Sequence, residues 1–380
     1  MRKNIEYLVI TGILLLVYSC NFSKTKDNKV IFSSSIVDFD LRNNEETILM
    51  SDFIDSVKMI WLKLPNDETI GRATRVCFDS SHIFILDRLQ QKVFHFDING
   101  TLLDELDKRG NGPGEYQSVY SCIARDNILY VFDKMDQKIL LYDYSFKFIR
   151  AIHCEIWVEN LFLLPDGSFL CFTPQYIYNA PNGLWKMSGE GKYMQQLYRD
   201  SEKYPLVSSE WDPFYITSLG GVGLKCPVKN EFYRYQDEKL TSVMKWIPHS
   251  KTALDFPGIE NCVSVKEPFW NCPIFVDTDQ WILGIWGEYN GGPSEIFSLY
   301  SKRQGKMHIS SSLTVDVGDV LLMGNPISAN LPNTMVTIVN DELFSNISGD
   351  SSLIKYKERL SDNQNLLLIY HFIEENTSHN

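Results

Sequence analysis

Short apolar runs separated by polar turns recur along the chain, and two stretches of this pattern can be aligned with each other. Residues 82–97, HIFILDRLQQKVFHFD, match residues 127–143, NILYVFDKMDQKILLYD, at an offset of 46 positions. Each copy reads as an apolar strand, a polar turn, a second apolar strand and an aspartate, and a further strand is expected on either side. The pattern therefore predicts a repeat of four short antiparallel strands, about 46 residues long.

This repeat is typical of a β-propeller blade, a small twisted sheet that buries both faces only by packing against other blades around an axis. A third repeat is expected over residues 157–174, where a Pro-Asp-Gly turn joins two strands. Later repeats over 216–247 and 273–309 carry insertions, and the best candidate for a short helix is LIKYKERL at 353–360. We therefore expect an all-β fold, a β-propeller with six four-stranded blades, with seven blades as the alternative.

The stretch RGNGPGEY at residues 109–116 has three glycines at alternate positions, which is compatible with a phosphate-binding loop or with a sharp turn. A dinucleotide-binding loop lies between a strand and a helix, and a P-loop ends in GK[ST]. Here the following segment, SVYSCIA at 118–124, has the character of a strand, and GK[ST] does not occur. The stretch therefore predicts a corner that connects two blades.

The N-terminus departs from the repeat pattern. Arg2 and Lys3 precede the apolar run 7–18, YLVITGILLLVY, which is shorter than the roughly 20 residues of a membrane-spanning helix. This is typical of a secretory signal peptide. Ser19 and Cys20 then resemble a bacterial lipobox, in which the cysteine is lipidated and the chain is cut before it; an ordinary signal peptide is the alternative. We expect a signal peptide at 1–19, a lipid-anchored tether at 20–28 and a single propeller domain at 29–380.

The lipoprotein signal, the FHFD of the first repeat and GNGPGEY together resemble a family of six-bladed β-propeller lipoproteins from Gram-negative bacteria. That family is NHL-like in shape, and its molecular function is largely unassigned. The resemblance covers nearly all of the mature chain, including residues 48–78 and 362–372. Since propellers often close by mixing strands from both ends of the chain, residues 57–64 are expected beside 366–372.

The resemblance implies a protein of the cell envelope, anchored to a bacterial membrane through lipidated Cys20, with the outer membrane favoured. Lys24, Lys26 and a single Asp27 follow the cysteine in place of an acidic cluster, which favours the periplasmic side. Removal of residues 1–19, which contain two basic residues and one acidic one, changes the formal charge from −12 to −13. This charge argues against nucleic acid as a partner and against electrostatic docking on anionic lipid.

Cysteine and histidine give little indication of a reactive centre. Seven cysteines follow Cys20 without a CxxC pair. Cys77, Cys122 and Cys171 lie in apolar runs and are expected to be buried as small hydrophobes, whereas Cys262 and Cys272 are the best candidates for a disulfide. The seven histidines form no metal-binding spacing, and there is no GxSxG motif to nominate a nucleophilic serine.

Recurring aspartates offer two interpretations. Asp87, Asp97, Asp133 and Asp143 follow strands at equivalent places, where aspartate readily accepts hydrogen bonds from turn amides. Some six-bladed enzymes instead hold calcium in the central channel through carboxylates, and calcium prefers such oxygen ligands. The structural interpretation is favoured, because a residue that recurs in each blade is poorly suited to a unique site.

Arginines and tryptophans are the candidate ligand-binding residues. A carboxylate at one mouth of the channel would suit the first group, Arg72, Arg75, Arg88 and Arg109, and stacking on a sugar or peptide would suit Trp281 and Trp286. Their alternatives are solvated surface and packing between blades. We expect a non-enzymatic binding or scaffold protein without a cofactor, whose ligand is an envelope protein, a peptide or a glycan. The alternative is a calcium-dependent hydrolase or lactonase with its site in the channel.

Overall fold

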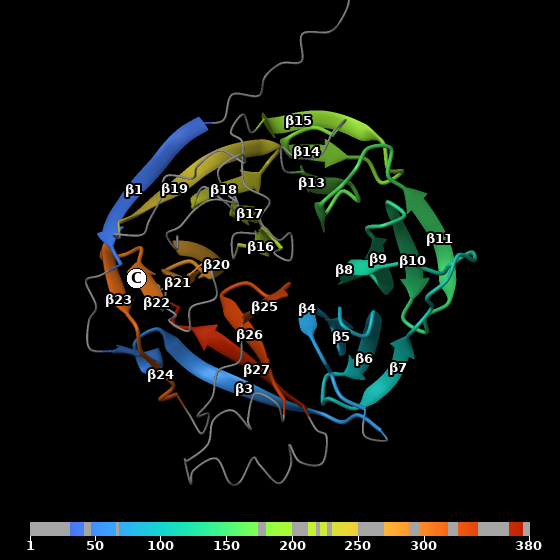
Figure 1. Ribbon diagram of the computed structural model, residues 1–380, viewed down its shortest axis with the longest axis horizontal. Helices are drawn as coiled ribbons and strands as arrows, with labels where there is room; N and C mark the ends of the chain where they lie inside the picture. The colour runs from blue at the N-terminus through green and yellow to red at the C-terminus, as the bar shows by residue number, and fades with distance from the viewer. Residues whose placement is uncertain are drawn as a thin grey trace, which may run out of the picture.

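The computed structural model describes residues 31–41, 47–65, 68–173, 180–199, 212–217, 221–225, 230–249, 270–288, 296–317, 326–340 and 365–374. Within these ranges the chain forms β-strands and a single turn of 3-10 helix, η1 (Met50–Asp52). The sheets are arranged as a ring around a central axis (Figure 1). In this part of the chain, no helical segment has the length and apolar character required to cross a bilayer.

Four antiparallel strands in sequence order make up each of the first five units. They are β4 (Ala73–Asp79), β5 (His82–Asp87), β6 (Lys92–Asp97), β7 (Leu102–Leu106); β8 (Val119–Arg125), β9 (Ile128–Asp133), β10 (Lys138–Asp143), β11 (Phe148–His153); β12 (Asn160–Leu163), β13 (Phe169–Thr173), β14 (Gly183–Met187), β15 (Tyr193–Arg199); β16 (Phe214–Ile216), β17 (Val222–Lys225), β18 (Glu231–Gln236), β19 (Lys239–His249); and β20 (Trp270–Asp277), β21 (Trp281–Glu288), β22 (Ile296–Ser301), β23 (Lys306–Ser310).

A further four-stranded unit mixes both ends of the chain, with β3 (Ile54–Leu62), β27 (Asn365–Phe372), β26 (Thr334–Val339) and β25 (Pro326–Ala329) in that spatial order. In β3, Val57 pairs with Tyr370 and Leu62 pairs with Asn365. The predicted closure of residues 57–64 on 366–372 is therefore confirmed. A two-residue parallel ladder from β25 to β4 joins this unit to the first one.

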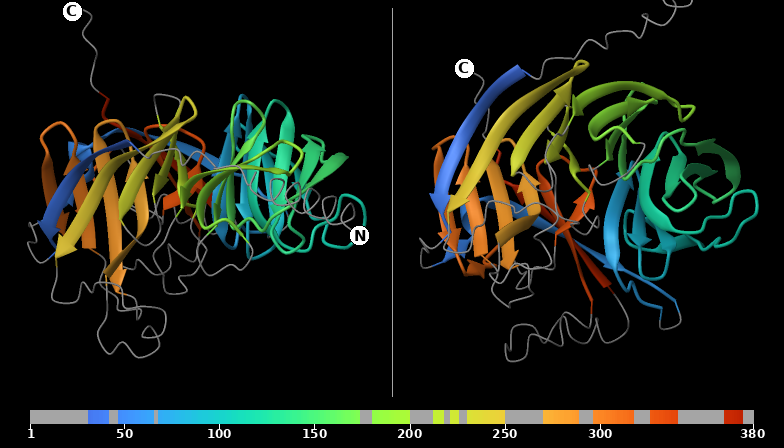
Figure 2. Two further views of the ribbon diagram at one scale, coloured as in Figure 1. Left: turned by 90° about the horizontal axis from the view of Figure 1, so that it is seen from above. Right: turned by 45° about the horizontal axis from the view of Figure 1, so that its top comes forward.

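The fold is an all-β propeller, as the repeat predicts. The aligned stretches are β5–β6 and β9–β10, and the turn at Pro-Asp-Gly connects β12 to β13. Inner strands such as β4, β8 and β16 lie near the axis, and outer strands such as β7, β11 and β3 form the rim (Figures 1 and 2). The helix predicted at 353–360, together with Cys20 and Cys262, lies outside the described residues.

Two pairings add to the units and have no counterpart in the sequence analysis. Strand β1 (Ile31–Asp40) lies parallel to β19 and makes that sheet five-stranded. Strand β2 (Ile48–Leu49) pairs in parallel with β24 (Leu313–Thr314). Both bring N-terminal residues to the outside of sheets formed much later in the chain.

Apolar side chains of neighbouring units interdigitate to form the core. Between β4–β7 and β8–β11, Phe84, Tyr116, Leu129 and Tyr142 are all fully buried. Burial of an aromatic or aliphatic side chain of this size contributes about 1.5–3 kcal/mol. Since each contact of this kind joins two sheets, the energy that stabilises one unit depends on its neighbours.

The stretch RGNGPGEY is a corner between β7 and β8, which confirms the prediction for it. Gly114 has φ of +75°, and a Cβ there would come within 2.6 Å of the Phe148 ring, so both backbone and space require glycine. The buried Tyr116 hydroxyl contacts the main-chain oxygen of Gln91 at 2.8 Å. The corner is thereby attached to the turn that joins β5 to β6.

Candidate functional site

A small pocket opens where the inner strands of several units begin. Its lining comes from the starts of β4, β8 and β12, from the turn after β5 and from the residue two before β16; the residues are Thr74, Arg75, Arg88, Tyr120, Ser121, Asn160, Leu161 and Asp212. The cavity volume is about 30 Å³. This is room for about two water molecules, or for the end group of a larger ligand.

Two cations at equivalent positions of the repeat lie against the Tyr120 ring. Arg88 follows β5 and Lys134 follows β9, and their charged ends are 4.4 Å and 4.1 Å from the ring centroid. Such contacts stabilise the cation through the negative face of the ring. Lys134 is also ion-paired with Glu159, and burial lowers the pKa of its ammonium group. Within the described residues, Arg88 forms no ion pair.

Arg75 lines the pocket and is 5% exposed. Its guanidinium pairs with Asp212, and Ser328 Oγ lies 3.3 Å from Arg75 Nη1 and 2.9 Å from Asp212 Oδ2. In the part of the chain that the structure describes, the buried Nε of Arg75 and the buried Oγ1 of Thr74 have no hydrogen-bond partner. Buried polar atoms are nearly always hydrogen-bonded, so these two atoms indicate a place for water or for polar ligand atoms.

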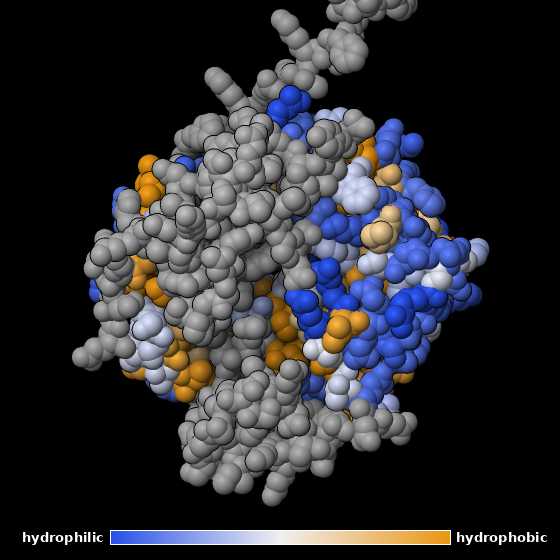
Figure 3. Space-filling model, viewed as in Figure 1, coloured by the Kyte–Doolittle hydropathy of each residue, from blue (hydrophilic) through white to orange (hydrophobic). Residues whose placement is uncertain are grey.

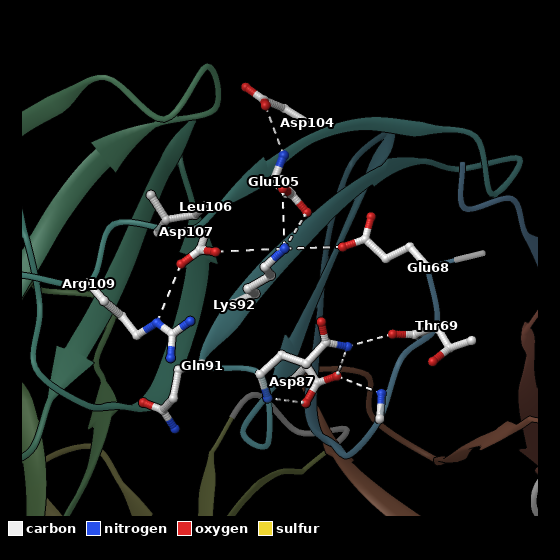
Figure 4. Close-up of polar contacts among 12 residues, drawn as sticks. Glu68, Thr69, Asp87, Gln91, Lys92, Asp104, Glu105, Leu106, Asp107 and Arg109 are labelled. Carbon is white, nitrogen blue, oxygen red and sulfur yellow. Dashed lines mark hydrogen bonds and ion pairs between the residues drawn. The ribbon is translucent and has the colours of Figure 1, made fainter. Parts of the chain in front are cut away.

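Arg72 and Arg109, the other two arginines expected at a channel mouth, do not line this pocket. Arg72 is exposed, and its main-chain N–H donates to Asp87. Arg109 lies in the corner with 57% of its side chain exposed, 3.6 Å from Asp107 (Figure 4). The structure therefore brings together two of the four arginines.

The tryptophan prediction needs a correction for Trp286. This side chain is fully buried, its Nε1 donates to Ser298 Oγ at 2.8 Å, and its ring stacks on Trp246 with centroids 6.0 Å apart. Trp286 thus fills the space between sheets and is not accessible to a ligand. Trp281 is partly buried and packs against Phe53, away from the pocket lining. Both lie on β21, whose neighbouring sheets cover its two faces.

The recurring aspartates bind turn amides, as the structural interpretation predicted. Asp87 accepts from the N–H groups of Gly71 at 2.6 Å and Leu89 at 2.9 Å, a set partly visible in Figure 4. Asp133 accepts from Gln117 at 2.7 Å. The two less buried aspartates also accept hydrogen bonds from turn amides. Asp97 accepts from the N–H groups of Asn99 and Thr101, and Asp143 accepts from those of Ser145 and Lys147. Among the described residues, no three His, Cys, Asp or Glu side chains gather in a way suited to a metal ion.

The ring seen face-on is largely hydrophilic over the side formed by β6 to β11, and apolar side chains reach the surface near its central hollow (Figure 3). Sequence reasoning missed Tyr120, Asn160 and Asp212 as lining residues. The repeat carried one usable signal, because the 46-residue offset aligns Lys134 with Arg88. Asp212 lies in a segment without a clear repeat, so nothing local associates it with Arg75.

The sequence matches the model of a family described as a domain of unknown function, DUF4934, over residues 34–371. The chain belongs to the DUF4934 family. This match spans the strands from β1 to β27 and therefore includes the whole ring and the pocket. No curated protein matches the sequence.

The fold of this chain resembles that of several solved structures. A predicted exported protein of Bacteroides fragilis superposes with a TM-score of 0.69 at 14% identity, covering 90% of this chain and 100% of that one. A DUF4221 member from Bacteroides vulgatus superposes with a TM-score of 0.51 at 8% identity, covering 84% and 97%. A streptogramin B lyase reaches a TM-score of 0.42 at 10% identity, covering 83% and 98%. At these identities the likeness concerns the fold and says nothing about the chemistry of this chain.

Proposed function

We propose that this chain is an exported, lipid-anchored, six-bladed propeller that binds a carboxylate-bearing protein, peptide or glycan at the mouth of its channel. The observation that carries the proposal is the pair of buried, unpartnered polar atoms on Thr74 and Arg75, beside an Arg88 guanidinium without an ion pair in the described residues. Donors that are already desolvated and fixed in place bind an acceptor at little further cost.

The chemistry of the pocket supports a carboxylate in particular. A guanidinium presents parallel N–H donors that match two carboxylate oxygens. The guanidinium of Arg88 lies over the Tyr120 ring, 4.4 Å from its centroid. The volume of about 30 Å³ has room for the polar end group of a larger ligand. Leu161 and the Tyr120 ring supply apolar contact for the carbon atoms next to it.

The proposed location of the protein in the cell envelope has separate support. The segment before Cys20 has the character of a lipoprotein signal, and the similar Bacteroides fragilis protein is described as exported. Lys24, Lys26 and Asp27 favour the periplasmic side of the outer membrane. In that position, the ligand would be an envelope protein, a peptide or a glycan.

The experiment that tests binding presents the full chain to arrays of peptides and oligosaccharides in which every acidic member has a neutral partner. Free-acid peptides are matched with amidated ones, and glucuronate-terminated glycans with glucose-terminated ones. We expect retention of acidic members and a loss of about tenfold in affinity for the neutral ones, since a charge-assisted hydrogen bond contributes about 1.5–3 kcal/mol.

Matched variants assign the binding to the pocket. Arg88→Gln should lose about tenfold in affinity, while Arg109→Gln, changed at the exposed corner, should bind like the unaltered chain. Arg88 is the better choice than Arg75, because removal of Arg75 would leave Asp212 unpaired at a cost of about 3–5 kcal/mol. Equal retention of acidic and neutral members, full binding by Arg88→Gln, or an array without any binder would each contradict the proposal.

A further inference from the structure

Two cysteines face each other across the boundary between neighbouring units. Cys77 lies on β4 and Cys122 on β8, the inner strands of adjacent sheets. Their Sγ atoms are 3.8 Å apart, and Cys77 Sγ is 3.2 Å from the main-chain oxygen of Cys122. Both residues are 1% exposed and lie in the core cluster that includes Phe84 and Leu129.

We infer that Cys77 and Cys122 form a disulfide that joins the two units covalently. A disulfide has an S–S distance of about 2.05 Å, so the sulfurs must approach by roughly 2 Å, which is within the range of small side-chain rotations. Strands β4 and β8 already pack together, so the two cysteines are held side by side in the folded ring.

The surroundings of these thiols differ from those of the other described cysteines. The hydrogen bond from Cys122, assisted by the Arg75 guanidinium, lowers the pKa of Cys77 to about 6. Burial raises the pKa of Cys154 to about 12 and raises that of Cys171 as well. In the closed boundary, Cys77 is therefore the thiol of this pair that more readily forms a thiolate.

The bond forms by two exchange steps with a small-molecule disulfide or an oxidised dithiol protein as the oxidant. The thiolate of one cysteine attacks one sulfur of the oxidant, which gives a mixed disulfide and releases the first thiol. The thiolate of the other cysteine then attacks the protein sulfur of that mixed disulfide and releases the second thiol. Two protein thiols are oxidised and one disulfide is reduced, with both protons passing to water or to the released thiols. Since both sulfurs are buried in the folded ring, exchange takes place before the two sheets close on each other.

The proposed disulfide would fix the position of β4 beside the pocket. Arg75 lies two residues before Cys77 on β4, so this cysteine is on the same face of its strand as a residue that lines the pocket. On β8, a bulge between Val119 and Ser121 places Tyr120 against a different core cluster from that of Cys122. The inference is independent of ligand identity, and neither lipidation nor a carboxylate ligand is needed for it.

The test refolds the reduced full chain in a glutathione redox buffer, alkylates free thiols with iodoacetamide in denaturant, and analyses a non-reduced digest by mass spectrometry. We expect a cross-linked pair of peptides that contain Cys77 and Cys122, lost on treatment with a reductant. Cys171→Ser should keep this cross-link, and Cys77→Ser should leave Cys122 alkylated.

Quantitative alkylation of both Cys77 and Cys122 in the refolded chain would overturn the inference. A cross-link from either of them to a different cysteine would overturn it as well. Because the decisive reading is taken on the unaltered sequence, a folding defect in a variant does not affect the outcome.

Discussion

His95 shows how burial decides the behaviour of a single residue. Its ring stacks on Phe84 with centroids 4.3 Å apart, and its Nε2 lies 2.7 Å from Nδ1 of His82. Burial, with a smaller effect from His82 and an opposing one from Asp104, lowers the pKa of His95 to about 4. The residue is therefore neutral at neutral pH and belongs to the packing between sheets.

Stability should consequently fall as the pH drops from about 6.5 towards 4. In the unfolded chain a histidine has a pKa of about 6.5, so in this window the unfolded state binds a proton that folded His95 does not. From this residue, the free energy of unfolding measured by urea denaturation should be lower at pH 5 than at pH 7 by about 2 kcal/mol. His95→Phe should reduce that dependence and exposed His153→Gln should not; an unchanged dependence in His95→Phe would show that the histidine does not cause it.

At the scale of elements, turns and strands are joined by buried carboxylates. Asp133 ends β9, is fully buried, and accepts hydrogen bonds from Gln117 and Ser118, which precede β8. It also accepts from the N–H of Asp136 in its own turn. One carboxylate therefore attaches the glycine-rich corner to the next unit, which explains why aspartate recurs at this place in the repeat.

Asp133→Asn should destabilise the fold by about 2–3 kcal/mol, because the amide replaces one acceptor oxygen with a donor that faces N–H groups. Chemical denaturation of the variant and the unaltered chain measures this difference. Asp136→Asn is the matched control, since that side chain is 40% exposed and should change stability by less than about 0.5 kcal/mol. Similar losses in both variants would mean that charge at this turn, and not the buried geometry, is what stabilises it.

Elements were predictable from the sequence where the repeat is regular and less so elsewhere. The alternation and turns of 82–97 and 127–143 anticipated β5–β6 and β9–β10, and the pairing of both chain ends followed from the expected ring. The parallel addition of β1 to β19 has no local signal, because it depends on a sheet formed some 200 residues later. Trp286 was misplaced for a similar reason: composition does not distinguish an exposed tryptophan from one between sheets.

The site was predictable only in part. Arg75 and Arg88 were nominated, but the pairing of Arg75 with Asp212 joins positions 137 residues apart in sequence. The contact of Cys77 with Cys122 spans 45 residues, close to the repeat length, and so had a periodic signal that the apolar surroundings concealed. Features within one repeat period were open to inference, and those between distant units required the folded ring.

At the scale of the molecule, the proposed lipid anchor on Cys20 would limit how far the ring can lie from a membrane. Strand β1 begins at Ile31, eleven residues after Cys20. An extended segment of that length spans at most about 40 Å, so a lipid on Cys20 would keep the ring close to the bilayer surface.

Cys20→Ala should accordingly move the protein from the membrane fraction to the soluble fraction, because a lipidated cysteine is the proposed attachment to the bilayer. Fractionation of cells followed by immunoblotting measures the distribution. Cys154→Ala, which changes a cysteine inside the ring, should stay with the membrane. Continued membrane association of Cys20→Ala would mean that another segment provides the anchor.

The pairing of β3 with β27 also affects the order in which the ring can fold. Leu62 and Asn365 are ladder partners, so one side of the ladder is synthesised about 300 residues before the other. At roughly 5–20 residues per second, β3 waits on the order of 15–60 s for its partner. During that interval its hydrogen-bonding edge is open to other strands or to a chaperone. The ring can therefore close only when the C-terminal strand β27 has become available to pair with β3.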